Sequence, residues 1–358
     1  MNQRNRVLQA HSWTGIALGI LLVYVALTGA LLAFRAELES AESRVRPALA
    51  ASSAALSPGR LMARAMELHA SVPPTLIQYG AGVEAPATVR FSDGDVISLD
   101  PVTGDLLRRN SWFASAAVTF IRLHTFAFWK RGAVVAASIA VVVGALAITG
   151  LWLCWPQSMR ALRGLLKFNR ALKGRLWNLN MHRTLGFYVS AFLLVSAGTG
   201  LPVAATWARE LLYLGTGSAV ERLPPHASAE SAATLSVDQL AQIAARLVPG
   251  PQYTTIRYRA GNLVECYMVA RDAPHPNART LLLLDGATGE VLSFVPYAQS
   301  SAGYRLYFWL FSIHTGQVGG IWGQLGLLSG ALGIPILAYT GIAAFWQRKQ
   351  MAKRPRPV

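Results

Sequence analysis

The chain opens with a short basic tail that leads into the stretch HSWTGIALGILLVYVALTGALLAF, residues 11–34. From Ser12 onward this stretch holds 23 residues without a charge, and a helix needs about 20 apolar residues to cross a bilayer. It is also longer than the apolar core of a signal peptide, so we expect an anchor that is not cleaved. Three further stretches are similarly long and apolar, at residues 133–155, 184–205 and 324–346. We therefore predict a membrane protein with four transmembrane helices.

The composition supports a membrane protein and explains the high net charge. Only 14% of the 358 residues are charged and 53% are hydrophobic, whereas a soluble domain is about a quarter charged. The net charge of +16 comes mainly from the N-terminal tail, the loop between the second and third spans, and the C-terminal tail, none of which contains an acidic residue. The positive-inside rule places these three segments in the cytoplasm. There they attract anionic membrane lipid, so we do not expect nucleic acid as a partner.

The two halves of the chain repeat one pattern. His11-Ser-Trp-Thr-Gly15 parallels His182-Arg-Thr-Leu-Gly186, and Leu123-His124-Thr125 parallels Ile313-His314-Thr315. A Thr-Gly pair follows each of these histidines within its own half, and the four pairs are Thr28-Gly29, Thr149-Gly150, Thr199-Gly200 and Thr340-Gly341. We predict a four-helix transmembrane bundle from a parallel internal duplication. Each half would consist of a span, a domain outside the cytoplasm and a second span.

The segments between the spans carry signals of small α+β domains. A helix is predicted at residues 59–68, after Ser57, and another at 240–247, after the capping box Ser236-Val-Asp-Gln239. Strands are predicted at 87–91, 96–99, 254–258, 263–270 and 280–284. Each domain then repeats the turn D-x-x-T-G-[DE]-x-L, in which Gly104 and Gly289 should adopt positive φ.

These features divide the chain into eight segments. We predict transmembrane helix 1 at 1–35, a first outside domain at 36–111, an interfacial segment with transmembrane helix 2 at 112–156, a basic cytoplasmic loop at 157–181, transmembrane helix 3 at 182–207, a second outside domain at 208–299, an interfacial segment with transmembrane helix 4 at 300–347 and a basic cytoplasmic tail at 348–358. Glycines inside the spans are open to two interpretations, close helix packing or room for a flat macrocycle.

Four of the seven histidines occupy equivalent positions in the repeat. The duplication places His11 with His182 near the cytoplasmic face and His124 with His314 near the outer face. Two imidazoles without a carboxylate or thiolate suit haem iron, because a structural zinc ion takes four ligands. Bis-histidine ligation leaves no open position, which favours electron transfer. The alternative is that these histidines simply lie in the membrane interface.

The remaining candidates are simpler to interpret. His69, His226 and His275 lie outside the spans, and we expect them to be solvated surface residues. Arg122 and Arg183 adjoin or nearly adjoin the paired histidines, so they are candidates for binding haem propionates or for reaching lipid phosphates. With no CxxCH motif, any haem is b-type.

The L-H-T and H-x-x-x-G starts, the Thr-Gly pairs and the D-x-x-T-G-[DE] turns together resemble the PepSY-associated transmembrane proteins. That family includes bacterial inner-membrane ferric-siderophore reductases. The resemblance implies two small PepSY-like α+β periplasmic domains, haem in the bundle and reduction of siderophore-bound ferric iron. Carried over by position, it makes His11, His182, His124 and His314 the haem ligands.

The leading hypothesis is therefore a transmembrane di-haem oxidoreductase, with two haem b groups per chain. It would be a multi-pass protein of the bacterial inner membrane, with both termini cytoplasmic, that reduces a ferric siderophore or another ferric complex at the periplasmic face. No nucleotide-binding motif is present, so we expect quinol or a cytoplasmic or membrane reductase as the electron donor. One alternative is a membrane-anchored PepSY binding or regulatory protein without redox activity. A transporter is disfavoured, because the spans lack charged residues.

Overall fold

The computed structural model describes residues 2–35, 37–38, 54–80, 86–110, 116–219 and 235–353. The chain forms two compact units. The bundle unit comprises Met1–Arg35, Phe120–Arg209 and Leu310–Val358, and the sheet unit comprises Ala36–Thr119 and Glu210–Trp309.

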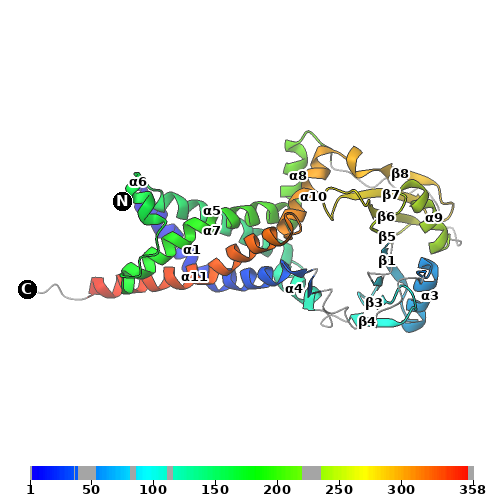
Figure 1. Cartoon of the computed structure of the whole chain (residues 1–358), viewed down its shortest axis with the longest axis horizontal. Helices are drawn as coiled ribbons and strands as arrows, with labels where there is room; N and C mark the ends of the chain where they lie inside the picture. The colour runs from blue at the N-terminus through cyan, green and yellow to red at the C-terminus, as the bar shows by residue number, and fades with distance from the viewer. Residues whose placement is uncertain are drawn as a thin grey trace, which may run out of the picture. The chain divides into compact units, whose positions relative to one another are not determined.

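Four long helices make up the bundle unit (Figure 1), and they are α1 (Gln3–Leu32), α5 (Gly132–Cys154), α7 (Gly174–Ala204) and α11 (Gly320–Lys353). Each is long and apolar enough to cross a membrane, which confirms the prediction of four spans. Helix α7 packs against α5 and α11, and α1 packs against the same two helices.

Helices α1 and α7 begin well before the apolar runs that predicted them. The Asn2 side chain starts α1 by accepting a hydrogen bond from the Asn5 N–H, and polar residues then continue the helix up to the apolar run. Hydropathy marks only the apolar part of a helix. His11 and His182 therefore lie inside their helices rather than at the start.

Small residues bring the long helices close together. A Cβ built on Gly326, Gly330 or Gly333 of α11 would lie 2.9–3.0 Å from the side chain of Phe192 or Val189 on α7. Between membrane helices such close approach provides van der Waals contact, which matters because lipid tails are as apolar as the helices themselves. Close packing is therefore the role of these three glycines.

Short helices precede two of the spans, in the segments that were predicted to be interfacial. Helix α4 (Ala116–Thr125) carries His124 and helix α10 (Ala302–His314) carries His314, each near its C-terminal end. Two other short helices are α6 (Met159–Leu165) and α8 (Thr206–Gly215). Gly316 and Gly319, with φ values of 73° and 80°, lie between α10 and α11, and Gly320, with a φ of 54°, begins α11.

The sheet unit contains one eight-stranded antiparallel sheet of order β4-β3-β2-β1-β5-β6-β7-β8. The strands are β1 (Pro74–Gly80), β2 (Ala87–Phe91), β3 (Val96–Leu99), β4 (Leu106–Asn110), β5 (Tyr253–Tyr258), β6 (Leu263–Val269), β7 (Arg279–Asp285) and β8 (Val291–Val295), followed by the short 3-10 turn η1 (Tyr297–Gln299). Strand β1 pairs with β5, with Ile77 opposite Ile256. The two segments predicted as separate domains therefore share one sheet.

Helices α3 (Pro58–Leu68) and α9 (Val237–Leu247) pack against the sheet in one apolar core. The largest core side chains, such as Ile77 and Phe91, are almost inaccessible to water. Ser57 caps α3 and the Ser236 capping box starts α9, as predicted. The Asp238 carboxylate also accepts hydrogen bonds from the Gly59 N–H (2.7 Å) and the Ser57 hydroxyl (3.0 Å). The first turn of α9 thus helps to cap α3.

The repeated turn motif has the same structure in both copies. The Oδ1 atom of Asp100 accepts hydrogen bonds from two backbone N–H groups, those of residues 102 and 103, and Asp285 does the same with residues 287 and 288. Gly104 and Gly289 have φ values of 75° and 77°, so the predicted positive φ is confirmed at both positions.

Candidate functional site

The structure brings the four bundle histidines together in two pairs. His11 of α1 faces His182 of α7, with ring centroids 6.2 Å apart and ring planes at 90°. His124 of α4 lies beside His314 of α10, with centroids 6.4 Å apart and planes at 43°. These are the two pairs that the repeat predicted.

The distance within each pair matches that of two imidazoles on opposite sides of one metal ion. An imidazole nitrogen binds a metal at about 2 Å and lies about 1.2 Å from its ring centre, so two imidazoles on opposite sides of one ion have ring centres about 6.4 Å apart. A tetrahedral ion would bring the same ring centres to about 5 Å. With these separations of 6.2 and 6.4 Å, each pair could hold one haem iron between its two rings.

A threonine on a neighbouring helix holds the Nδ1 atom of each histidine. The hydrogen bonds join His11 to Thr149 (2.9 Å), His124 to Thr28 (3.2 Å), His182 to Thr340 (3.3 Å) and His314 to Thr199 (3.2 Å). All four threonines belong to the Thr-Gly pairs that mark the repeat. The sequence identified these positions but did not reveal that they accept hydrogen bonds from the histidines, because the contacts join distant parts of the chain.

The other partners of the threonine hydroxyls favour one tautomer of each imidazole. Every one of the four threonine hydroxyls donates its proton to the carbonyl four residues earlier, at 2.6–3.0 Å. A hydroxyl has one proton, so its oxygen accepts from the Nδ1–H group. For His124 and His182, the carbonyls of Val25 and Leu337 accept as well, both at 3.0 Å. The Nε2 lone pair is then left to bind a metal.

The glycine of each Thr-Gly pair makes room for the imidazole ring. A Cβ built on Gly200 would lie 2.6 Å from the Cε1 atom of His314, and one on Gly29 would lie 2.9 Å from that of His124. The corresponding distances at Gly341 and Gly150 are 3.1 and 3.3 Å. Since real Cβ atoms are essentially never closer than 3.0 Å to a neighbour, any larger residue at Gly200 or Gly29 would displace the imidazole ring.

The His11/His182 pair lines a cavity of about 430 Å³ inside the bundle unit. Its walls are mainly apolar side chains and glycines from all four long helices, and Arg183 is one of four arginines that line it. Among the described residues, neither pair belongs to a cluster of three or more His, Cys, Asp or Glu side chains. The donor set is therefore two neutral imidazoles, which fits haem better than zinc.

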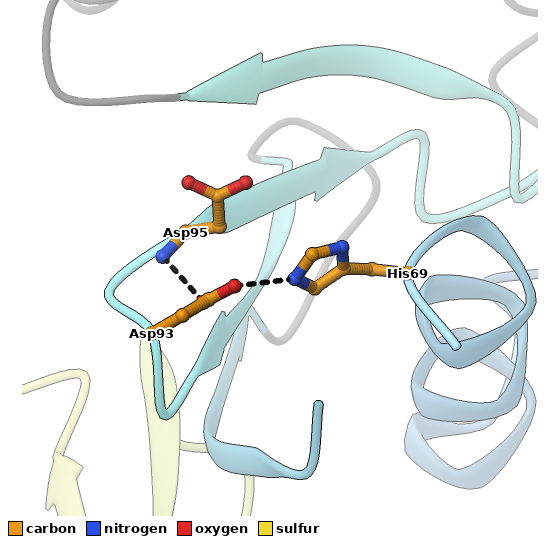
Figure 2. A group of neighbouring side chains, drawn as sticks. All are labelled: His69, Asp93 and Asp95. Carbon is orange, nitrogen blue, oxygen red and sulfur yellow. Dashed lines mark hydrogen bonds and ion pairs between the residues drawn. The ribbon is translucent and has the colours of Figure 1, made fainter. Parts of the chain in front are cut away.

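A second cluster lies in the sheet unit, where His69 points from the end of α3 toward Asp93, with Asp95 nearby (Figure 2). The His69 Nε2–H donates to Asp93 at 2.7 Å, while Arg109 donates to Nδ1 at 2.6 Å and forms an ion pair with Asp95. A hydrogen bond from the Asp95 N–H, and then one from His69, lower the pKa of the Asp93 carboxyl. Since both ring nitrogens are used, this cluster is a polar network that ties α3 to the β2–β3 turn.

The three remaining histidines differ from one another. His275 is buried, with 4% of its surface exposed, so its prediction as a surface residue is wrong. Its Nε2 atom lies 2.8 Å from the Tyr297 hydroxyl, and its ring packs against Trp309. The flanking prolines suggested a loop, but this loop folds under an aromatic cluster. His69 is partly buried in the network above, and His226 lies outside the described residues.

Comparison with known proteins agrees with this architecture. A family model described as the PepSY-associated TM region matches residues 8–348, which is nearly the whole chain. No curated protein matches the chain.

Proposed function

Because the chain belongs to the family defined by the PepSY-associated TM region, we propose that it is a transmembrane di-haem electron-transfer protein that reduces ferric iron. One observation carries the proposal. Within the two histidine pairs the ring centroids are 6.2 and 6.4 Å apart. The Nδ1 atom of each imidazole is hydrogen-bonded to a threonine, which leaves its Nε2 atom for a metal.

The residues of the chain would act by holding and orienting the cofactors. Haem ligated by two histidines supplies one-electron redox chemistry and has no free position for another ligand. The threonines fix the ring planes and raise the basicity of the ligating nitrogens, and the glycines allow the rings to approach the helices. The substrate would gain one electron per iron by outer-sphere transfer. A chelated ferric complex, such as a ferric siderophore, fits this chemistry because reduction weakens its bonds to hard oxygen ligands.

The proposed setting is the bacterial inner membrane, with both termini in the cytoplasm and the sheet unit, as PepSY-like domains, in the periplasm. The basic loop at residues 157–181 and the basic tails support this orientation. The symmetrical strand order about the β1–β5 pair and the four equivalent His–Thr hydrogen bonds support an internal duplication. Quinol or a reductase would supply the electrons.

The first test is the visible spectrum of the purified protein, oxidised and then reduced with dithionite, together with a pyridine haemochrome assay. We expect two low-spin b haems per chain. His314→Ala should remove the haem of the His124/His314 pair and His11→Ala the other, while His69→Ala, which replaces an imidazole outside the bundle unit, should retain both.

The second test measures the reaction itself. Ferric desferrioxamine and a ferrous-specific chelator would report iron reduction by the dithionite-reduced protein in vesicles. We expect His314→Ala to abolish reduction. A colourless protein, made with sufficient haem supply and tolerant of all four histidine substitutions, would overturn the proposal and favour a binding or regulatory protein.

A further inference from the structure

The cavity beside His11 and His182 has a charged lining as well as an apolar one. We call it the His11 cavity. Four arginines line it, and they are Arg4 of α1, Arg175 and Arg183 of α7 and Arg348 of α11. Arg4 and Arg175 lie close to the first residues of α1 and α7, and Arg348 lies close to the last residue of α11. No aspartate or glutamate is among the described residues that line the cavity.

The arginines have few partners within the described part of the chain. Arg4 donates from Nη2 to the carbonyl of Leu153 at 3.2 Å, and Arg348 stacks over the Phe345 ring at 5.7 Å. The Nε atom of Arg175 is buried and has no hydrogen-bond partner. Taking a guanidinium group out of water is unfavourable unless an anion or an acceptor compensates it. Only Arg175 is partly buried, whereas Arg4, Arg183 and Arg348 are exposed. The cavity therefore combines four positive charges, three of them solvent-accessible, with a large apolar lining.

We propose that the His11 cavity is a binding site for a flat apolar dianion, whose two carboxylates are bound by Arg175 and Arg183. Guanidinium groups bind carboxylates through paired, charge-assisted hydrogen bonds. This inference rests on the proposed function, since the carboxylates are those of a haem held by His11 and His182. The phosphate of an anionic lipid offers the same anionic chemistry, so the test must separate the two sources.

The experiment compares two probes that differ only at their two propionates, which are free carboxylates in one and neutral methyl esters in the other. The full chain carrying His124→Ala and His314→Ala, so that only the His11/His182 pair remains, is prepared without haem and placed in phosphatidylcholine nanodiscs. It is titrated with protohaem and, separately, with protohaem dimethyl ester, and the Soret band reports binding. We expect the free acid to bind at least about tenfold more tightly than the ester.

The variants then assign that preference to residues. Arg175→Gln with Arg183→Gln should bind acid and ester equally, while Arg163→Gln, an exposed arginine of α6 outside the cavity, should keep the full preference. Arg175→Lys with Arg183→Lys keeps both positive charges but cannot form the paired hydrogen bonds of a guanidinium group. This variant should retain part of the preference for the free acid. Circular dichroism and an unchanged affinity for the ester would show that the glutamine variant is folded.

Three outcomes overturn the inference, and they can be told apart. If acid and ester bind equally to the parent protein, or if the preference survives in the glutamine variant, the arginines do not bind the carboxylates and the proposed function still stands. Phosphatidylglycerol nanodiscs offer a lipid phosphate that can compete for the arginines. If these nanodiscs weaken the binding of both acid and ester to the parent protein, but not to the glutamine variant, the arginines bind lipid phosphate. If neither probe produces a Soret shift, the proposed function fails as well.

Discussion

Replacing Gly200 by alanine tests the central geometry of the bundle unit. The new Cβ would lie 2.6 Å from the Cε1 atom of His314, whereas ordinary contact begins at 3.4 Å. The ring must therefore retreat by about 0.8 Å, the difference between those two distances. Its hydrogen bond to Thr199, already 3.2 Å long, would then lengthen beyond the usual range.

The expected cost combines two effects. Overpacking costs about 1–3 kcal/mol, and loss of the hydrogen bond costs about 0.5–1.5 kcal/mol. Alanine recovers at most about 1 kcal/mol through its higher helix propensity. A net loss of about 2 kcal/mol would correspond to roughly thirtyfold weaker binding of the proposed haem at the His124/His314 pair.

The assay is haem stoichiometry per chain, together with the reduced spectrum and the thermal unfolding midpoint. Gly198→Ala is a matched control, because Gly198 lies two residues away on α7 and a Cβ there would meet nothing within 4 Å. We expect Gly200→Ala to purify with about half the haem and Gly198→Ala to keep all of it. Full haem content and an unshifted spectrum in Gly200→Ala, or equal loss in both variants, would refute the reasoning.

Three further predictions concern the sheet unit. Asp238→Asn removes a negative charge that caps α3 by accepting a hydrogen bond from the Gly59 N–H. The sheet unit should therefore lose about 1 kcal/mol of stability. An unfolding midpoint equal to that of the control Asp105→Asn, which replaces an exposed aspartate, would contradict this. Burial lowers the pKa of His275, so folding favours the neutral ring, and stability should fall as the pH drops below about 6.5 toward the lowered pKa. His275→Gln should flatten that pH dependence of the unfolding midpoint, and an unchanged slope would assign it to other groups. Burial, and then the neighbouring Glu265, raise the pKa of the Cys266 thiol to about 12. This thiol should therefore not react with a thiol reagent at pH 8 until the protein unfolds. Rapid labelling of the folded chain would show instead that the thiol is accessible.

The local features of this protein follow from its sequence. Hydropathy identified four spans, because crossing a bilayer requires a length and polarity that any 20-residue window reveals. The caps at Ser57 and Ser236 and the positive φ at Gly104 and Gly289 were predictable for the same reason, since each depends on a few adjacent residues. The helix starts were less accurate, because polar residues extend a helix without changing hydropathy.

The strands that escaped prediction lack a clear pattern. Strand β1 begins at Pro74 directly after another proline, a signal that favours a loop. Strands β4 and β8 lie at the two edges of the sheet, where one side of each has no partner strand among the described residues. Such strands need less apolar patterning, as the sequence Leu-Leu-Arg-Arg-Asn of β4 illustrates.

The sequence by itself indicated which residues occupy equivalent positions, because its two halves repeat one pattern of motifs. It could pair His11 with His182 and His124 with His314, and it marked four Thr-Gly pairs without a role. Only the tertiary structure decided that His11 meets Thr149, 138 residues away, and that β1 joins β5 in a single sheet. The physical reason is that a hydrogen bond across a bundle depends on helix rotation and packing distance. Those are properties of several helices together, and no one segment of the chain contains them.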